Sequence, residues 1–247
     1  MRKSKEKYSP KKIKKTIIVS SIVGISIAAI LISCLVYAYV YVKNICKDIL
    51  KDKSTQELLN GNLINNMQIS SYIYDKDGNQ IGYLYGTENR VEIEYKDLPK
   101  NLVNAIISIE DERFFEHHGV DIKRTSAAVL NYLSNKKDSS FGGSSITQQL
   151  VKNLTDDDET SVTRKIREWY RAFLLETKYS KEDILKIYTN TIYLGENAYG
   201  VQVASKVYFD KPVTDLNLAE SAILAAAIQS PEATNPYTSE KSRKTFK

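Results

Sequence analysis

The chain has 247 residues, with 35 Lys/Arg, 30 Asp/Glu and two cysteines, which suffices for one ordinary domain and an appendage. Residues 1–15 hold eight of the basic side chains and a single acidic one. Residues 16–247 therefore carry 27 basic and 29 acidic side chains. The overall basic balance thus does not indicate nucleic-acid binding, and two cysteines exclude a disulfide framework.

Residues 16–42 are almost entirely apolar or small and carry no charge. As a helix this run would be about 40 Å long, against roughly 30 Å for the hydrocarbon core of a bilayer. A cleaved signal peptide is the alternative, but its apolar region is shorter and ends in a small-residue cleavage site. This run ends instead in residues typical of membrane interfaces, namely Tyr37, Tyr39, Tyr41 and Lys43. The sequence predicts a transmembrane helix with the basic tail, residues 1–15, in the cytoplasm.

The rest of the chain is divided into a stalk and one domain. Residues 43–70 are polar and rich in Asn and Lys, and we assign them to the stalk. The domain, residues 71–247, opens with a predicted hairpin, because apolar residues at 72–74 and 81–85 flank the turn dipeptide Asp77-Gly78. Residues 91–95 alternate like a third strand. Helical periodicity then predicts helices over 99–111, 121–134, 145–154, 161–178, 181–190, 199–208 and 216–229.

A carboxylate pair ends the first of these helices. Glu110 and Asp111 follow an apolar run directly, and aromatic residues, two histidines and a glycine come next. A core does not tolerate unpaired carboxylates, whereas a carboxylate at the edge of an apolar environment is suited to serve as a general acid or base. A polar cap of the helix C-terminus is the alternative interpretation.

Three further segments have unusual residue choices. Residues 142–153 form a glycine-hydroxyl turn that opens a helix and would suit an anion, or would be an ordinary serine cap. Residues 164–169 form a dense cationic cluster around Glu168, for which a surface ion pair between Arg164 and Glu168 is the alternative. The spacing of Asn190, Gly195 and Gly200 predicts a loop that is held at its two glycines and precedes a buried helix. Two helix C-caps are the alternative interpretation.

In this order the segments resemble family 51 of the peptidoglycan glycosyltransferases, which includes monofunctional transglycosylases and the N-terminal halves of class A penicillin-binding proteins. The first motif of that family, Glu-Asp-x-x-Phe-x-x-His-x-Gly, is met by Glu110, Asp111, Phe114, His117 and Gly119. The second, Gly-x-Ser-Thr-Ile-Thr-Gln-Gln, corresponds to 142–149 with Ser145 in place of Thr. The third, Arg-Lys-x-x-Glu, is met by Arg164, Lys165 and Glu168. Two later blocks, 188–211 and 218–236, extend the resemblance over residues 70–236.

The resemblance implies a mainly α, lysozyme-like fold and the polymerisation of lipid II into β-1,4 glycan strands. The growing glycan would move with inversion from undecaprenyl pyrophosphate to the 4-hydroxyl of an incoming GlcNAc. Glu110 would be the general base, and Glu168 the second catalytic carboxylate, near the pyrophosphate and a candidate metal ligand. The remaining residues implied to bind substrate are Asp111, Phe114, His117, Ser144, Gln148, Gln149, Lys152, Arg164 and Lys165.

Four further positions depart from the family's pattern. Ala127 and Thr160 stand where Arg is frequent, Lys186 stands where Glu is usual, and Thr189 stands where Leu is usual. Two cations that the family's pattern would place near the phosphates, at positions 127 and 160, are therefore missing. The candidate substitutes are Lys123, Arg124, Arg167, or a metal held partly by the acidic run 156–159. A solvated loop is the alternative for that run.

The resemblance also implies the surroundings of the protein. No tightly bound cofactor is expected, and a divalent cation, Mg²⁺ or Mn²⁺, is the candidate. The expected partners are lipid II, the growing glycan strand and the membrane, with other cell-wall synthesis proteins as candidates and no nucleic acid. The expected location is a single pass through the bacterial cell membrane with an extracytoplasmic domain. A non-catalytic scaffold that binds lipid II or glycan, and a glycan-cleaving enzyme on a similar fold, are the alternatives.

Overall fold

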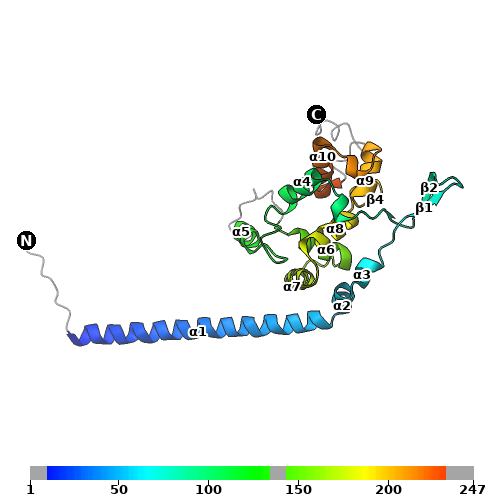
Figure 1. Cartoon of the computed structure of the whole chain (residues 1–247). Helices are drawn as coiled ribbons and strands as arrows, with labels where there is room; N and C mark the ends of the chain where they lie inside the picture. The colour runs from blue at the N-terminus through cyan, green and yellow to red at the C-terminus, as the bar shows by residue number, and fades with distance from the viewer. Residues whose placement is uncertain (1–9, 134–142, 232–247) are drawn as a thin grey trace, which may run out of the picture. The chain divides into compact units, whose positions relative to one another are not determined.

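The computed structural model describes residues 10–133 and 143–231, and the chain divides into two compact units, 1–48 and 49–247. The first unit contains most of α1 (Pro10–Lys51), a single unbroken helix (Figure 1). From Ile18 to Lys51 this helix is long and apolar enough to cross a membrane, with a mean hydropathy of 2.5 and no part of the apolar window buried. The helix continues past the predicted span, 16–42, into residues assigned to the stalk.

The remainder of the predicted stalk differs from the expectation, because residues 49–70 belong to the second unit. They contain α2 (Lys53–Leu59) and α3 (Asn62–Asn65). Asp52 caps α2 by accepting the backbone N–H of Thr55 at 3.0 Å. Leu58 is fully buried in the core of the unit. The sequence around Leu58 is mostly polar, so local composition does not reveal this docking.

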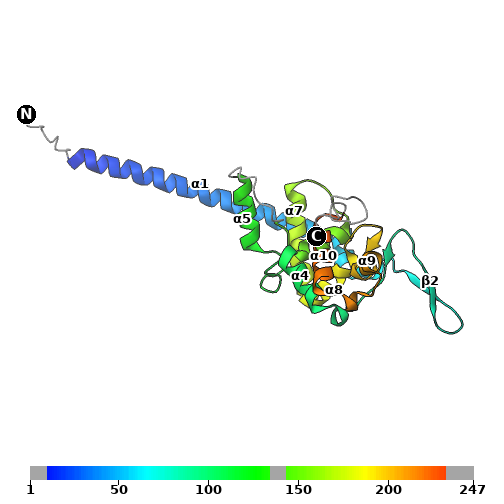
Figure 2. The same cartoon turned by 90° about the horizontal axis from the view of Figure 1, so that it is seen from above.

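The predicted hairpin is confirmed as β1 (Ser71–Tyr74) and β2 (Gln80–Leu84), which pair antiparallel. Its turn is fixed by Asp75, whose carboxylate accepts the backbone N–H groups of Asp77 and Asn79 at 2.8 Å each. Gly78 has a φ of 83°, a conformation that glycine adopts without steric cost. The hairpin extends away from the helices of its unit in both views (Figures 1 and 2).

The predicted third strand, 91–95, is wrong. Only β3 (Asn89–Arg90) is a strand here, and it pairs in parallel with β4 (Ala198–Tyr199). The side chain of Asn190 accepts the N–H of Ile93 and donates to its carbonyl, both at 2.9 Å. This side-chain amide satisfies the backbone groups that a neighbouring strand would otherwise take, and the chain then turns into the 3₁₀ helix η1 (Tyr95–Asp97).

All seven helices predicted after Pro99 occur within the described residues, each ending within two residues of its predicted bounds. Serine and asparagine caps explain several starts. Ser145, Ser180 and Asn217 each form a reciprocal capping box with the residue three positions later. The helices are α4 (Lys100–Glu110), α5 (Ile122–Leu133), α6 (Ile146–Thr155), α7 (Val162–Lys178), α8 (Lys181–Thr191), α9 (Val201–Phe209) and α10 (Leu218–Gln229), with the 3₁₀ helix η2 (Val213–Asp215) between the last two.

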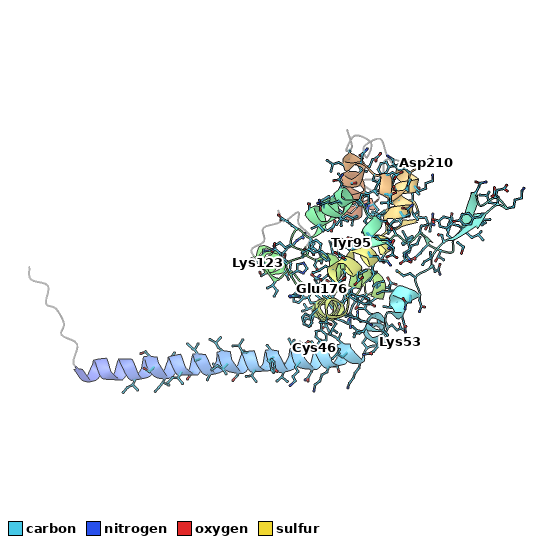
Figure 3. All side chains as sticks on the ribbon, viewed as in Figure 1. Cys46, Lys53, Tyr95, Lys123, Glu176 and Asp210 are labelled. Carbon is cyan, nitrogen blue, oxygen red and sulfur yellow. The ribbon has the colours of Figure 1, made fainter. Side chains whose placement is uncertain are left out.

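Helix α8 is the centre of this mainly α unit. Its residues from Ile187 to Thr191 are all buried, and it packs against α6 and α9 (Figure 1). Helices α4 and α10 lie side by side, as Figure 2 also shows. Glu176 of α7 accepts hydrogen bonds from Thr147 of α6 at 2.5 Å and from Lys181 at 2.7 Å, and Figure 3 labels it within the body of the unit. These contacts hold α6, the helix that carries the second motif, between α7 and α8.

Candidate functional site

The loop after α4 is fastened to the start of α6 by Asp111. This carboxylate is fully buried. It accepts the backbone N–H of Ile146 at 3.0 Å and pairs with Nε2 of His117 at 2.9 Å. Asp111 and His117, implied to bind substrate, are thus placed where they hold the first motif against the second.

Phe114 also lies in the core, with none of its side chain exposed. Its ring meets that of His117 edge-on, with 6.2 Å between centroids, and the ammonium group of Lys181 lies 4.2 Å from its centroid. Gly119 has a φ of 81°, and a Cβ there would lie 2.6 Å from the carbonyl of Ala172. The first motif therefore needs its glycine, because the loop lies directly against the backbone of α7.

Glu110 has one carboxylate oxygen fixed by a neighbour. The side chain of Gln149 donates from Nε2 to Glu110 Oε2 at 2.7 Å, and the hydroxyl of Tyr188 donates to Gln149 Oε1 at 2.9 Å. Glu110 is 7 % exposed, and its Oε1 is buried and has no hydrogen-bond partner among the described residues. This oxygen could accept a hydrogen bond from a hydroxyl once the side chains that cover it move aside.

Glu168 lies in a different electrostatic environment. Its Oε1 accepts from Gln148 Nε2 at 2.8 Å and also from Lys165, while its Oε2 accepts from Arg164 at 2.5 Å. Lys165 in turn donates to the hydroxyl of Ser144 at 2.9 Å. The ion pair of the alternative interpretation is therefore present, but it is not at the surface, since Glu168 is only 5 % exposed. Two cations around one carboxylate leave a local excess of positive charge.

The start of α6 is an ordinary serine cap. Ser145 accepts the N–H of Gln148 at 3.1 Å, and its own N–H donates to Gln148 Oε1 at 3.0 Å. The N–H of Ile146 is taken by Asp111. The N–H groups of Ser145, Ile146 and Gln148 are therefore used within the protein, and the serine cap of the alternative interpretation is present. Gly142 lies outside the described residues.

The acidic run after α6 holds cations. Asp157 and Glu159 accept from Arg167 at 2.8 and 2.9 Å, and Asp158 lies 3.1 Å from Lys152. Within the part of the chain that the structure describes, no group of three or more His, Cys, Asp or Glu could hold a metal ion. Arg167, a candidate substitute for a lost phosphate-side cation, is thus already paired.

The remaining departures have separate surroundings. Lys186 lies 2.7 Å from Glu94 and 3.1 Å from Glu92. The hydrogen bond to Glu94 is the main cause that raises the pKa of Lys186, so this residue fastens α8 to the segment before η1. Arg124 donates to the backbone carbonyl of Glu110, which places a cation next to the candidate base. Ala127 and Thr160 are both exposed.

A cavity of about 530 Å³ opens beside the first motif. Its lining includes an ion pair that the sequence analysis missed, in which Arg113 donates to Asp121 at 2.6 Å. Burial alone would raise the pKa of Asp121, but the N–H of Arg124 and the Arg113 guanidinium outweigh it and lower this pKa. Lys123 stands at the margin of the unit (Figure 3). The cavity is lined by Arg113, Glu116, His117, His118, Val120, Asp121, Ile122, Lys123 and Phe173.

The sequence analysis did not identify Tyr188 and Arg171 as residues that support the site. Tyr188 lies inside a family block, but its partner Gln149 is 39 positions away, and no local sequence pattern predicts that contact. Arg171 is 3 % exposed and pairs with Asp52 at 2.7 Å and Asp157 at 3.1 Å. Its position in the sequence, on the buried face of a predicted helix, was the available signal.

Known proteins match this chain over the same region. The Transglycosylase family model matches residues 77–246. Penicillin-binding protein 1A of Clostridium botulinum (strain Langeland) is 48% identical over 172 residues, which are 68% of this chain and 21% of that protein. Penicillin-binding protein 1F of Bacillus subtilis (strain 168) is 42% identical over 171 residues, 69% of this chain and 24% of that protein. A crystal structure of penicillin-binding protein 1A from Haemophilus influenzae matches at 22% identity and a TM-score of 0.35, over 73% of this chain and 17% of that one.

The chain spans about a fifth to a quarter of the length of these curated relatives. The family match nevertheless covers most of the chain and includes the three motifs that surround Glu110 and Glu168. The chain therefore belongs to the transglycosylase family, family 51 of the peptidoglycan glycosyltransferases.

Proposed function

We propose that this protein is a membrane-anchored glycosyltransferase that polymerises lipid II into β-1,4 glycan strands, with undecaprenyl pyrophosphate as the leaving group. One observation carries the proposal. Two buried carboxylates lie in contrasting surroundings, because Glu110 has a buried oxygen without a hydrogen-bond partner while Glu168 is enclosed by Arg164 and Lys165. A transfer reaction needs this division, since a base acts on the acceptor and positive charge acts on the leaving group.

On the acceptor side, a sugar hydroxyl is a poor nucleophile and requires a base within hydrogen-bond reach. Glu110 Oε1 would take the proton of the GlcNAc 4-hydroxyl while the hydroxyl oxygen forms a bond to the anomeric carbon of the donor. The bond from that carbon to the pyrophosphate oxygen breaks, and its electron pair leaves with the pyrophosphate. Attack from the face opposite the leaving group inverts the anomeric centre without a covalent intermediate.

On the donor side, pyrophosphate leaves as a stable anion and needs positive charge more than a proton. Arg164 and Lys165 supply it, and their side chains are 19 % and 31 % exposed, so they are accessible yet partly desolvated. Glu168 holds both cations in place. Because their combined charge exceeds its own, the cluster attracts a phosphate although it contains a carboxylate.

A resident divalent cation fits this cluster poorly. Mg²⁺ and Mn²⁺ prefer several oxygen ligands, but both oxygens of Glu168 already accept from Gln148, Lys165 and Arg164. A metal ion would have to displace a cationic side chain. We therefore assign the neutralisation of the pyrophosphate to Arg164 and Lys165 and route no step through a metal.

The lipid-linked substrate suggests why the chain would carry the long apolar helix α1 as a membrane anchor. We infer that this helix crosses the membrane once, with the basic residues 1–15 in the cytoplasm by the positive-inside rule and the enzyme unit on the outer side. Anchoring confines the site to the bilayer surface, where lipid II and the growing strand reside, and so raises its effective concentration there. Other cell-wall synthesis proteins would be partners at the same surface.

The experiment uses the full chain in vesicles with fluorescent lipid II, and gel electrophoresis of the products. Wild-type protein should yield glycan polymer, and Glu110→Gln should lower the yield by about 10³-fold or more, because a positioned base contributes about 10²–10⁴-fold. Glu112→Gln is the matched control, since Glu112 is an exposed carboxylate two residues away. Undiminished polymer with Glu110→Gln would exclude this role of the base.

Two other outcomes identify the alternatives. Lipid II binding without polymer formation by the wild type would indicate a scaffold. New reducing ends released from finished peptidoglycan would indicate a glycan-cleaving enzyme. The cationic cluster around Glu168 favours transfer over hydrolysis, because a glycan without pyrophosphate offers those cations no anionic leaving group.

A further inference from the structure

We propose that Tyr188 is a positioning residue for the transfer reaction, because its hydroxyl fixes the side-chain amide of Gln149 and, through it, the carboxylate of Glu110. This inference rests on the proposed role of Glu110 as the base. The three side chains come from three helices, α8, α6 and α4. The hydrogen bonds that join them are 2.9 Å from Tyr188 to Gln149 and 2.7 Å from Gln149 to Glu110.

The direction of each hydrogen bond follows from the chemistry of the groups. An ionised carboxylate only accepts, so Gln149 must direct its NH₂ group to Glu110. Its amide oxygen then faces Tyr188, and the tyrosine must donate. Burial, followed by the charges of Glu110 and Asp111, raises the pKa of Tyr188 well above its ordinary value. The hydroxyl therefore stays protonated and remains a donor throughout the pH range in which enzymes work.

Loss of that hydroxyl would release the amide. The amide oxygen of Gln149 would then have no donor, and the side chain would no longer be held at the position from which its NH₂ group meets Glu110. The hydrogen bond that orients the carboxylate would be less well aligned and weaker. The hydroxyl of Tyr188 thus holds Gln149 in place for its hydrogen bond to Glu110 Oε2, and leaves Glu110 Oε1 as the oxygen that receives the proton.

The neighbouring glutamine shows the same arrangement. Gln148 donates to Glu168 while its amide oxygen accepts the backbone N–H of Ser145. A backbone donor performs there what Tyr188 performs for Gln149. The two amides are therefore held by the same principle, but only the one that faces Glu110 depends on a side chain that a single substitution can change.

Other charged groups near Glu110 are engaged elsewhere. Arg124 of α5 donates to its backbone carbonyl, and Asp111 is taken by His117 and the N–H of Ile146. On the neighbouring helices, Lys152 of α6 pairs with Asp158, Lys186 of α8 with Glu92 and Glu94, and Glu220 of α10 with Lys211. Among the described residues, Gln149 alone donates a hydrogen bond to the side chain of Glu110.

The test begins with Tyr188→Phe in the full chain, which removes one buried oxygen atom and keeps the ring. The kcat for lipid II polymerisation should fall about tenfold, as expected from the loss of one buried hydrogen bond, while KM changes less than about twofold. A hydrogen bond donated to a carboxylate favours its ionised form. The acid limb of the rate profile should therefore move to higher pH. Unchanged kcat and an unmoved acid limb would overturn the proposal.

Tyr208→Phe is the matched control. The hydroxyl of Tyr208 donates to the carbonyl of Leu194 at 2.6 Å, far from α6 in the sequence and within the same family block as Tyr188. The substitution removes the same atom from the same residue type. It should leave both kcat and the acid limb unchanged, and an equal effect of the two variants would show that a tyrosine hydroxyl matters only for the fold.

A double-mutant cycle separates positioning from a structural role. In a Gln149→Met background, Tyr188→Phe should cost less than about twofold in kcat, because the tyrosine acts through an amide that is already absent. The same tenfold loss in both backgrounds would overturn the proposal, since the hydroxyl would then act independently of Gln149.

A readout without substrate keeps this inference distinct from the proposed function. The side-chain carboxyl of Glu110 can be titrated by ¹³C NMR, with its signal identified by loss in Glu110→Gln. Its midpoint should move to higher pH in Tyr188→Phe, and also in Gln149→Met, which tests the same hydrogen bond should Tyr188→Phe fold poorly. An unmoved midpoint overturns the positioning role even in an active enzyme. A moved midpoint in a protein that makes no polymer supports it and overturns the function.

Discussion

Gln148 and Gln149, consecutive residues of α6, each hold a different carboxylate of the site, Glu168 at 2.8 Å and Glu110 at 2.7 Å. Consecutive helical residues point about 100° apart around the axis. The first turn of α6 therefore lies between the proposed base, Glu110, and the cationic cluster around Glu168. This geometry keeps Arg164 and Lys165 on the Glu168 side, so that one carboxylate has an unpaired oxygen and the other is neutralised.

Glu168→Gln should damage both stability and turnover. Arg164 and Lys165 would lose a carboxylate that is only 5 % exposed, and breaking such a buried pair costs about 3 kcal/mol. Chemical denaturation of the full chain should show this loss, and polymer formation should fall at the same time. Glu182→Gln, on the exposed side of α8, should change neither. A Glu168→Gln variant as stable and active as wild type would contradict the role of Glu168 in holding Arg164 and Lys165.

Arg171→Met should loosen α2. The guanidinium is 3 % exposed and pairs with Asp52 and Asp157, so its removal should lower the free energy of unfolding by about 3 kcal/mol and speed amide exchange across Lys53–Leu59. Arg167→Met provides the comparison, because its pairs with Asp157 and Glu159 are more exposed and are worth about 1 kcal/mol at most. Equal losses for both variants would argue against a specific role in docking α2.

Asp121 should make stability depend on pH at the acid end. Its pKa is lowered in the folded protein, so its contribution is fully present above the unfolded-state pKa of about 3.9 and is lost as the pH falls through the lower folded-state value. Asp121→Asn should therefore be less stable than wild type at neutral pH, and the difference should shrink below about pH 4. Denaturation measured at several pH values checks this, and a gap that widens on acidification would refute it.

Gly119→Ala should be far more costly than Gly78→Ala. Both glycines have positive φ, but a Cβ at 119 would lie 2.6 Å from the Ala172 carbonyl, whereas one at 78 would have nothing within 4 Å. Gly78→Ala should lower the free energy of unfolding by about 1–2 kcal/mol from backbone strain alone. Gly119→Ala should exceed that by more than about 2 kcal/mol, because the loop must move off α7. Thermal unfolding of the two variants measures the difference directly, and similar losses would disprove the steric account.

Local chemistry allowed much of the fold to be predicted from the sequence. The capping residues Ser145, Ser180 and Asn217 mark helix starts through hydrogen bonds to residues three positions away. The dipeptide Asp77-Gly78 is a comparable local signal, because it marks the turn between β1 and β2. Such signals are complete within a few residues, so no tertiary contact was needed to read them. The resemblance likewise identified both carboxylates and both glutamines.

Tertiary contacts decided the rest. Residues 91–95 alternate like a strand, yet Asn190, 97 positions from Ile93, takes the backbone groups that a ladder would need. The expected stalk instead docks through Leu58 and the Asp52–Arg171 pair, which spans 119 positions. The sequence by itself determined which helices form after Pro99 and which carboxylates are candidates for catalysis. Only packing decided what each carboxylate meets, because a hydrogen bond between helices depends on where they lie, and the link from Tyr188 through Gln149 to Glu110 exists only once α4, α6 and α8 have come together.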